Sequence, residues 1–530
     1  MPPILSRAYI RAHPSDPLPT RRNRVPAPRR DFFYTLPSPF AYVLEEFPPD
    51  FAYVLEGFLP KFAYVLEKFT IFVIEIQRFY MIRRNLIENL RFWARKKNRK
   101  PLVIRGARQV GKTTLVKEFA GEFDGFIMLN LERQDDRKLF DAADTPHKVM
   151  EILRLTRLPG MTSFDGKRIL LFIDEIQSEP KAIGMLRYFY EDMPELFVIA
   201  VGSRLQELFK TGVSFPVGRV EYMSMRPCFF DEYLDGMNLP GLSGIVRNAE
   251  VDPALHDELN SHFKTYALIG GMPEVISEYA EVRDIVALSP LYDGLLQSYD
   301  EDVEKYAATQ QQVAVLRHLL RNGWGYAGQT ISFARFGGSS YTSTVVHQAF
   351  ELLEKAFLMS LDYPTTSVKA PVSESFTRSP KLIWLDSGLV NFSAGIQVEY
   401  LTNPTIADVW RGHAAEQIVG QELRQPLDRN YMDSQCFWVR DKKGSNAEVD
   451  FVFQMDGKVI PVEVKSGANA HLRSLQSFMS IEGAPDIAVR VWPGRLSVDE
   501  IKSGEGLPCF RLINLPYYLV GQLDKVISRL

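Results

Sequence analysis

The most informative segment of this chain is residues 101–114, which read Pro101-Leu-Val-Ile-Arg-Gly-Ala-Arg-Gln-Val-Gly-Lys-Thr-Thr114. It begins with a short apolar run, as a buried parallel strand does, and it continues into a helical pattern. Between them lies Gly106-x-x-x-x-Gly111-Lys112-Thr113, a phosphate-binding loop. Glycines let successive backbone N–H groups point at phosphate oxygens, Lys112 brings a positive charge to the β- and γ-phosphates, and the Thr113 hydroxyl can ligate Mg²⁺. The residues expected to hold the nucleotide are Gly106, Ala107, Arg108, Gln109, Val110, Gly111, Lys112, Thr113 and Thr114.

A second motif supports the first. Residues 168–175 read Arg-Ile-Leu-Leu-Phe-Ile-Asp-Glu, an apolar run that ends in two carboxylates. A central strand with this ending places Asp174 beside the Mg²⁺ ion and leaves Glu175 to polarise a water molecule against the γ-phosphate. Buried strands often end in an acidic residue, so this run becomes specific only because it follows a phosphate loop. Together the two motifs predict a protein that binds ATP with Mg²⁺.

The composition is that of an ordinary globular protein, with 46% hydrophobic and 24% charged residues. At 530 residues the chain is too long for one core and predicts several domains. Its formal net charge of -3 gives no overall basicity that would favour nucleic acid. Three widely spaced cysteines, Cys228, Cys436 and Cys509, form neither a disulfide framework nor a zinc site. No apolar run is long enough for a membrane span and no secretory signal is visible, so we expect a cytoplasmic protein without membrane contact.

The N-terminal segment, residues 1–80, differs from the rest. Residues 1–39 are rich in Pro and Arg and are expected to be disordered. The sequence Phe-Ala-Tyr-Val-Leu-Glu then occurs three times, at 40–45, 51–56 and 62–67. Intervening prolines interrupt any continuous helix, and three copies are too few for a solenoid. We expect an extension outside the folded protein; the alternative is a small docking module.

The chain from Met81 onward alternates strands and helices, which is typical of a parallel sheet with right-handed crossovers. A basic helix over 82–95 precedes the phosphate loop, either to touch nucleic acid or as a solvated face. Later strands are expected at 125–132, 196–203 and 218–225. Ser203 ends one of them and could hydrogen-bond the γ-phosphate or the attacking water, or simply form a turn. Arg219 in the last of them is a candidate to reach the nucleotide; the alternative is an ordinary surface arginine.

These motifs, with Val201-Gly-Ser203, Gly218-Arg-Val220 and Tyr266-Ala-Leu-Ile-Gly-Gly-Met-Pro-Glu274, resemble a family of prokaryotic AAA+-type P-loop ATPases. In that family a restriction-endonuclease-like region follows the ATPase. The resemblance implies an α/β protein with a P-loop NTPase parallel sheet, a helical lid, a winged-helix domain and a restriction-endonuclease-like α/β domain. The corresponding segments are 81–226 for the ATPase, 227–310 for the lid, 311–395 for the winged helix and 396–530 for the nuclease-like domain.

The lid and the winged helix have their own sequence signals. Gly270, Gly271 and Pro273 interrupt the helices of the lid, and we expect a hinge there. Residues 343–355 are the candidate recognition helix of the winged-helix unit, followed by a strand that enters the wing. Such units dock in the major groove of DNA, but they also bind proteins, and the sequence favours neither.

The second chemical pattern lies near the C-terminus, where Asp450 and Glu463-x-Lys465 flank a hairpin turn at residues 456–457. This pattern resembles the PD-(D/E)XK nuclease site. Glu463 and Lys465 lie on one face of a strand by its two-residue period, and Asp450 lies across the hairpin. Asp450 and Glu463 can hold Mg²⁺, and Lys465 can orient the attacking water. Upstream, Glu416 matches the helix that supplies a further glutamate.

Three functions are compatible with these observations. The first is an ATPase that couples nucleotide turnover to binding or cleavage of DNA or RNA through the nuclease-like domain. The second is an ATPase switch whose C-terminal domain binds nucleic acid without cutting it. The third is a scaffold that remodels protein partners. The expected cofactors are ATP and Mg²⁺, and a homo-oligomer is compatible with each function.

Overall fold

The structure is a computed structural model that describes residues 82–202, 216, 218–397, 413–427, 435–441, 447–465, 472–502 and 509–530. The N-terminal extension (1–80) and Ser203 lie outside these residues, so what the sequence predicts for them stays a prediction. Within the described ranges, no helix has both the length and the apolar character that a membrane span requires.

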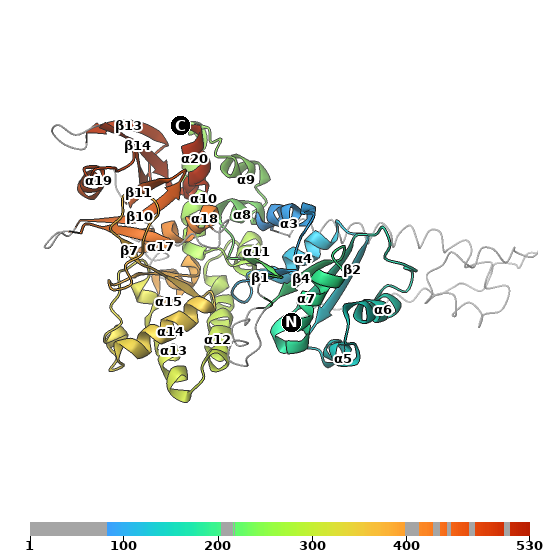
Figure 1. Ribbon diagram of the computed structural model, residues 1–530. Helices are drawn as coiled ribbons and strands as arrows, with labels where there is room; N and C mark the ends of the chain where they lie inside the picture. Colours follow the sequence, from blue (N-terminus) through green and yellow to red (C-terminus); the bar gives the residue numbers. More distant parts are fainter. Residues whose placement is uncertain are drawn as a thin grey trace, which may run out of the picture. The chain divides into compact units, whose positions relative to one another are not determined.

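A five-stranded parallel sheet forms the first domain, in the order β2-β3-β4-β1-β5 (Figure 1). The phosphate loop follows β1, and helix α4 begins at Lys112 directly after it. The expected strands therefore form, although β5 begins two residues after Arg219. The strands are β1 Leu102–Arg105, β2 Gly125–Asn130, β3 Ile169–Asp174, β4 Phe197–Val201 and β5 Glu221–Ser224; the helices are α3 Leu86–Arg95, α4 Lys112–Ala120, α5 Gln134–Ala142, α6 Pro146–Arg157 and α7 Pro180–Asp192.

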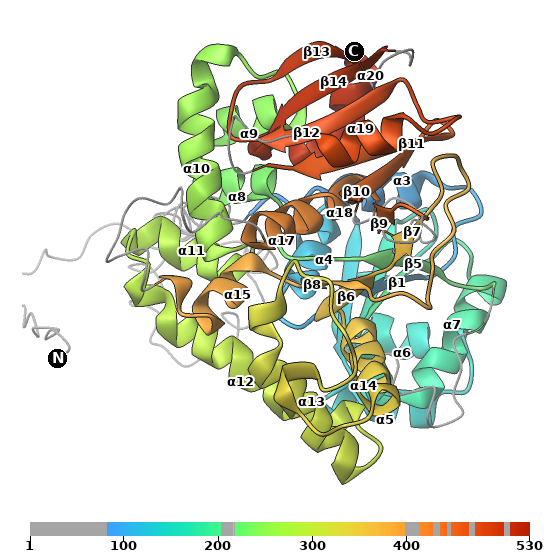
Figure 2. The same cartoon turned by 90° about the vertical axis from the view of Figure 1, so that its left-hand side faces the viewer.

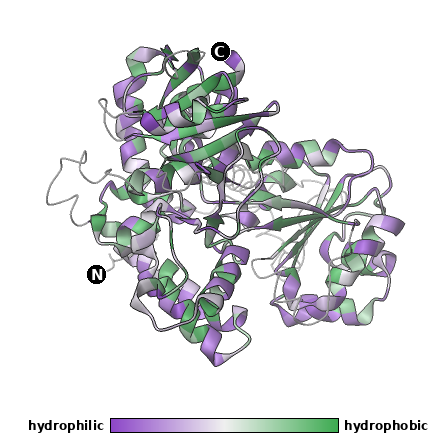
Figure 3. Ribbon diagram, turned by 60° about the vertical axis from the view of Figure 1, so that its left-hand side comes forward, coloured by the Kyte–Doolittle hydropathy of each residue, from purple (hydrophilic) through white to green (hydrophobic). Residues whose placement is uncertain are grey.

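Both faces of this sheet are covered because strands β1 to β4 are largely apolar on both sides, whereas the edge strand β5 is only partly buried. Leu102 and Ile104 of β1 pack with α3 and α4, whereas Val103 between them packs with α5, α6 and α7 on the other face. Neighbouring side chains of a strand point to opposite faces, so a continuous apolar run needs helices on both. In Figure 3 the strands are accordingly mostly green, and the purple residues concentrate on the helices. Of α3, only one face is buried, including Leu90 and Trp93.

Five helices follow the sheet in the segment that the sequence assigns to a lid, and we call this segment the lid: α8 Phe230–Gly236, α9 Pro240–Arg247, α10 His256–Ile269, α11 Pro273–Val282 and α12 Ser289–Tyr306. The expected break occurs between α10 and α11. Its glycines are required by close packing. A Cβ atom on Gly270 would lie 2.1 Å from Asp386 Oδ1, and one on Gly271 would lie 2.1 Å from the Cys228 carbonyl oxygen. The Gly-Gly pair thus marks a tightly packed junction, where the sequence predicted a hinge.

The next segment contains a pair of helices, α13 Gln310–Asn322 and α14 Ser343–Lys355, and a small antiparallel sheet. Its two strands are β6 Met359–Asp362 and β8 Lys381–Trp384. Helix α14 has the bounds that the sequence predicts for the recognition helix. Helix α15 Ser387–Ser393 follows β8 directly.

The C-terminal domain is built on a seven-stranded mixed sheet in the order β13-β14-β12-β11-β10-β9-β7 (Figure 2). Its strand β7 comes from before residue 396, so this sheet takes one strand from the segment that the sequence assigned to the winged helix. Strands β10 and β11 form the predicted hairpin. The strands are β7 Pro364–Thr365, β9 Cys436–Val439, β10 Glu448–Met455, β11 Lys458–Val464, β12 Ile487–Trp492, β13 Ser497–Lys502 and β14 Cys509–Pro516; the helices are α17 His413–Glu422, α18 Arg424–Leu427, α19 Arg473–Met479 and α20 Leu523–Arg529.

One face of the C-terminal sheet shares a hydrophobic core with the lid. Phe451 and Ile460 pack with Ile418 of α17, and the same core continues to Tyr266 of α10 and to Leu102 of β1. The other face packs separately, with Phe478 of α19 against Trp438 of β9. The lid therefore packs between the two sheets. A displacement of its helices would disturb the packing of side chains against both sheets.

The junction at Gly271 should not tolerate a side chain. Gly271→Ala should lower the midpoint of thermal unfolding by several degrees, because the new methyl group meets a backbone carbonyl that cannot swing away. Gly241→Ala on α9 is the control, since nothing lies within 4 Å of the added carbon. Equal unfolding midpoints for the two variants, measured by calorimetry, would contradict the close packing.

Candidate active site

The phosphate loop adopts a backbone that depends on its glycines. Gly106 has φ +149° and Gly111 has φ +95°, both unfavourable for residues with a side chain. A Cβ atom on Gly106 would also lie 2.2 Å from the carbonyl oxygen of Met225, the residue that follows β5. Glycine at 106 is thus needed for two reasons, the turn itself and the approach of the neighbouring strand.

Lys112 lies folded over this loop. Its Nζ donates to the carbonyl oxygens of Gly106 (2.9 Å) and Ala107 (2.6 Å). Burial lowers the pKa of Lys112 to about 8, although Glu175 and Asp174 act in the opposite direction. Two neutral carbonyls compensate an ammonium poorly. The phosphates of a nucleotide would supply the negative charge that this buried amine lacks.

The residues expected to hold Mg²⁺ come together. Thr113 Oγ1 donates to Asp174 Oδ2 at 2.9 Å, which joins the start of α4 to the end of β3. Burial raises the pKa of Asp174, so this carboxylate gains from a nearby cation. A hydroxyl and a carboxylate are oxygen ligands of the kind that Mg²⁺ prefers. The pair therefore fits the ion, with Asp174 and Thr113 as the residues that would hold it.

Glu175 follows directly in a left-handed conformation, with φ +52°. Gln177 Nε2 donates a hydrogen bond to Glu175 Oε2, which fixes the direction of the carboxylate. The sequence predicted Glu175 as the group that polarises water. It did not single out Gln177, since a glutamine two residues further on carries no motif.

Thr113, Asp174 and Glu175 line a cavity of about 450 Å³ together with residues of the lid. The lid contributes Pro273, Glu274 and Ser277 at the start of α11. The loop residues Arg108, Gln109, Gly111, Lys112 and Thr114 also line it. The cavity thus lies between the phosphate loop and the lid, where a bound nucleotide would contact both.

Arg108 connects the loop to the lid a second time. Its Nε lies 3.0 Å from Asp302 Oδ2, and the side chain of Asp302 is fully buried. Lys305 Nζ lies 2.7 Å from the other oxygen of the same carboxylate. Helix α12 is thereby held to the phosphate loop by an ion pair that crosses from one domain to the other.

Of the other two residues that the sequence predicted for this site, the structure describes only Arg219, which does not join the cavity. Arg219 Nε forms an ion pair with Glu191 Oε1 of α7 at 3.1 Å. Strands β1 and β5 are parallel and Leu102 pairs with Glu221, so Arg219 lies at the end of the sheet opposite to the phosphate loop. The structure therefore gives Arg219 no contact with the nucleotide cavity of its own chain. Ser203 lies outside the described residues.

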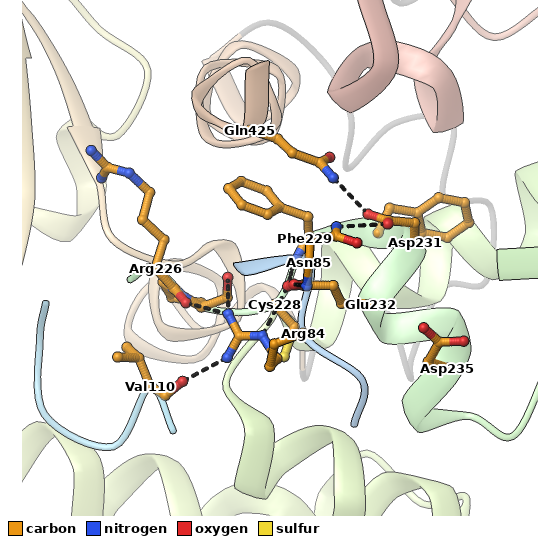
Figure 4. A network of polar contacts seen from close by, with 12 residues as sticks. Arg84, Asn85, Val110, Arg226, Cys228, Phe229, Asp231, Glu232, Asp235 and Gln425 are labelled. Atoms are coloured by element: carbon orange, nitrogen blue, oxygen red, sulfur yellow. Dashed lines mark hydrogen bonds and ion pairs between the residues drawn. The ribbon is translucent and has the colours of Figure 1, made fainter. Parts of the chain in front are cut away.

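The sequence also missed Arg84, a buried arginine just before α3 (Figure 4). Its guanidinium donates to the carbonyl oxygen of Val110 in the phosphate loop at 2.7 Å and to that of Arg226 at 2.6 Å. Its Nε lies 3.1 Å from Glu232 Oε2 of α8. Arg84 thus ties the phosphate loop to the first residues of the lid. A single arginine outside any motif gives no sequence signal for such a role.

The polar contacts continue from the lid into the C-terminal domain. Tyr266 of α10 has its hydroxyl 3.0 Å from the Cys228 carbonyl oxygen and 2.6 Å from Glu422 Oε1 of α17. The Tyr266 hydroxyl has one proton, so it can donate to only one of these oxygens; when it donates to the Cys228 carbonyl, a protonated Glu422 can donate to the Tyr266 hydroxyl oxygen. Burial indeed raises the pKa of Glu422 to about 8. Glu422 therefore holds a proton at neutral pH, and its hydrogen bond with Tyr266 joins α17 to the lid.

A second contact runs beside it. The Asp386 carboxylate accepts from the N–H groups of Gly271 (2.5 Å) and Leu389 (3.1 Å), which joins the lid break to the start of α15. The Gln417 amide of α17 donates to the Trp384 carbonyl oxygen and accepts from its N–H, both at 2.9 Å. Helix α17 is thus bound to the lid through Glu422 at its C-terminal end and to β8 through Gln417 near its middle.

Glu416 and Asp450, predicted as members of a nuclease-like site, also come together. The Asp450 carboxylate accepts from the Val464 N–H at 2.7 Å, and Lys465 Nζ lies 2.6 Å from Glu463 Oε1. Burial raises the pKa of Asp450 to about 6 and that of Glu463 to about 7. The sequence pattern is therefore reproduced in space across the β10–β11 hairpin.

The arrangement of these groups does not fit a divalent cation. Lys381 of β8, which the sequence did not single out, places its Nζ 2.6 Å from Glu416 Oε2 and 4.0 Å from Asp450 Oδ1. Among the residues that the structure describes, no three His, Cys, Asp or Glu side chains form a set that could hold a metal ion. An ammonium already stands among the carboxylates that Mg²⁺ would need.

Comparison with known proteins agrees with the first site. Residues 98–234 match the family described as an AAA domain. Residues 260–400 and 411–511 match two families described as domains of unknown function, DUF8612 and DUF4143. No curated protein matches the chain. Together with the phosphate loop, the Asp-Glu strand and the sheet order, the AAA-domain match supports ATP binding and hydrolysis by an AAA domain over residues 98–234.

Solved structures with a similar course of the chain are distant. A Walker-type ATPase of Pyrococcus abyssi is 14% identical, with a TM-score of 0.37, and the match covers 59% of this chain and 96% of that one. The Orc1 protein of Aeropyrum pernix, solved in complex with DNA, is 14% identical with a TM-score of 0.25; the match covers 62% of this chain and 92% of that one. A signal-transduction ATPase of Pyrococcus horikoshii with a tetratricopeptide repeat sensor is 14% identical with a TM-score of 0.24; the match covers 66% of this chain and 48% of that one.

The proton on Glu422 should appear in the pH dependence of stability. The folded chain retains it up to pH about 8, whereas the unfolded chain releases it near the ordinary glutamate value. The wild type therefore loses stability as the pH rises through this interval. Glu422→Gln, which cannot ionise but keeps the shape of the protonated acid, should lose less, by an amount on the order of a few kcal/mol.

Urea unfolding of the wild type and of Glu422→Gln between pH about 5 and about 9 measures the difference. Glu281→Gln on α11 is the control, because its side chain is exposed. If Glu422→Gln and wild type lose stability in parallel with rising pH, Glu422 is ionised in the folded chain and the proposed hydrogen bonding is wrong.

Proposed function

We propose that this protein is a Mg²⁺-dependent ATPase switch, in which the state of the nucleotide reaches the C-terminal domain through the lid. In this proposal Thr113 and Asp174 hold the ion, Lys112 compensates the β- and γ-phosphates, and Glu175 polarises the attacking water. Ser203 would assist at the γ-phosphate, and a homo-oligomer would suit an ATPase of this class; both stay predictions.

The observation that carries the switch is the unbroken series of buried polar contacts from the phosphate loop to α17. Arg84 binds Val110 in the loop and the carbonyl oxygen of Arg226. Two residues further, Cys228 binds Gly271 through its N–H (2.7 Å) and Tyr266 through its carbonyl oxygen. Tyr266 then contacts Glu422 of α17. Buried hydrogen bonds are costly to break singly, so a shift of the loop on hydrolysis favours a concerted shift of these groups.

We further propose that the C-terminal half binds nucleic acid and does not cut it. The helix pair α13 and α14 with the β6–β8 sheet supports a winged-helix unit, which gives such a domain a way to dock. A hollow on α13 is lined by Arg317, His318 and Arg321. Arg317 is paired there with Asp300 and Glu304, so Arg321 is the side chain that best suits a phosphate oxygen. Cleavage would require the divalent ion that the Glu416–Asp450 cluster does not fit. The alternative partner is a protein, as in a remodelling scaffold.

The ATPase roles are tested by two substitutions. Lys112→Ala should abolish ATP hydrolysis, since backbone amides alone compensate the phosphate charge poorly. Glu175→Gln should still bind ATP but turn it over roughly 100-fold more slowly or worse, because the base is lost while the shape is kept. Binding of a fluorescent ATP analogue and phosphate release measure the two effects.

Glu151→Gln on α6, exposed and remote from the cavity, is the matched control for Glu175→Gln. Phosphate release at the wild-type rate from either Lys112→Ala or Glu175→Gln would show that the assigned roles are wrong.

The coupling to nucleic acid is tested by ATP turnover with and without DNA or RNA. We expect one of them to raise the wild-type rate severalfold. Tyr266→Phe keeps the ring but removes the hydroxyl between Cys228 and Glu422, so it should retain basal turnover and lose the response.

Tyr188→Phe, on the exposed side of α7, is the control and should respond like the wild type. A wild-type rate that neither DNA nor RNA changes would contradict nucleic acid as the partner and favour the protein-remodelling alternative. A full response in Tyr266→Phe would contradict the route through Glu422.

A further inference from the structure

Lys381 is a buried charge that the ATPase does not use. It is the first residue of β8, and its side chain is only 1% exposed. A lysine is almost never buried to this extent unless its charge is compensated. The carboxylates that lie within 4.0 Å of its Nζ, Glu416, Glu448 and Asp450, belong to the C-terminal domain, which lies in a different part of the sequence.

Oxygen atoms surround the Lys381 ammonium on the side of the hairpin. Nζ lies 2.6 Å from Glu416 Oε2 and donates to the Asp450 carbonyl oxygen at 3.1 Å. Glu448 Oε1 lies at 3.6 Å and Asp450 Oδ1 at 4.0 Å. Burial alone would lower the pKa of Lys381, but these carboxylates outweigh it and raise the pKa above its ordinary value.

Aromatic rings complete the surroundings. The centroids of Phe437 and Phe451 lie 5.2 Å and 5.0 Å from Nζ, within the range of a cation–π contact. Oxygens and ring faces together form an environment built for one positive charge. A neutral side chain in this place would remove the positive charge that lies closest to the Glu416 carboxylate, at 2.6 Å.

A divalent ion would compete for the same oxygens. An ion that bound both Glu416 and Asp450 would lie within a few ångströms of the ammonium, and charges of the same sign repel strongly at that distance in a buried site. Glu463, the remaining carboxylate of the pattern, forms its own ion pair with Lys465 at 2.6 Å. Each part of the acidic cluster already has a lysine.

We propose that Lys381 is the resident cation of this cluster, and that the protein takes up no divalent ion there although it carries the residue pattern of a metal-dependent nuclease. The ammonium holds β8, α17 and the β10–β11 hairpin together as a metal ion would. This inference concerns only the C-terminal site and does not depend on the proposed ATPase switch.

Calorimetric titration with Mn²⁺ tests the proposal on the full chain without nucleotide. All proteins carry Asp174→Asn, which removes the predicted ion ligand of the nucleotide site. The chain with Lys381 intact should show no binding. Lys381→Met should gain one Mn²⁺ site, and the further change Asp450→Asn should remove it again. Lys458→Met, in the same hairpin but exposed and paired with Asp486, is the control and should gain nothing.

Two outcomes would overturn the proposal. One is Mn²⁺ binding by the chain with Lys381 intact that Asp450→Asn abolishes. The other is a folded Lys381→Met chain that binds no Mn²⁺, which would mean that the oxygens are not arranged for a cation.

If Lys381→Met does not fold, the double variant Lys381→Met, Glu416→Gln removes one charge of each sign. A thermal unfolding midpoint recovered to near the wild-type value supports the role of Lys381 as a counter-charge. A double variant as unstable as the single one would show that the lysine acts through its packing, and the proposal would fail.

Discussion

The guanidinium of Arg84 is the contact on which the arrangement of this protein depends most. Three of its hydrogen bonds go to backbone carbonyls, one in the phosphate loop and two at the entry to the lid. Carbonyls have no freedom to move without their peptide planes, so the arginine couples two segments of backbone and not two flexible side chains. Its charge is compensated by Glu232, which is itself buried. Removing the guanidinium would leave the buried Glu232 carboxylate without its counter-charge, at a cost of several kcal/mol.

The junction beyond Arg84 is built from groups that differ in chemistry but share one property, which is burial. Asp386 accepts hydrogen bonds from two backbone N–H groups, and burial raises its pKa to about 6. Glu422 retains its proton, and burial raises the pKa of the Cys228 thiol to about 12. In this junction Glu422 and Cys228 are neutral and the Asp386 carboxylate is held by backbone hydrogen bonds, so the groups can shift together with little change in exposed charge. This property is what a conformational switch requires of its interior.

The C-terminal domain carries the residue pattern of a metal-dependent nuclease, but the surroundings of these residues do not suit a metal ion. Asp450, Glu463 and Lys465 lie where the hairpin register predicts, with Phe451 opposite Val462. The pattern by itself is compatible with an Mg²⁺ site, since carboxylates on neighbouring strands need a positive charge. That charge comes from Lys381, which is distant in sequence and is delivered by the small β6–β8 sheet.

Much of the first site could be predicted from the sequence because its chemistry is local. The glycines, Lys112 and Thr113 lie in one loop, and Asp174 and Glu175 end one strand, so spacing along the chain is enough to recognise them. The strands of the first sheet, helix α14 and the β10–β11 hairpin follow from periodicity and turn residues in the same way. Arg84, Tyr266, Glu422 and Lys381 could not be assigned, because each acts through a partner far away in sequence. Only the tertiary structure decided that Gly270 and Gly271 mark a packed junction, that Arg219 lies away from the nucleotide cavity of its own chain, and that a lysine stands among the carboxylates. The physical reason is that burial and Coulomb interactions depend on distance in space, which the order of residues does not contain.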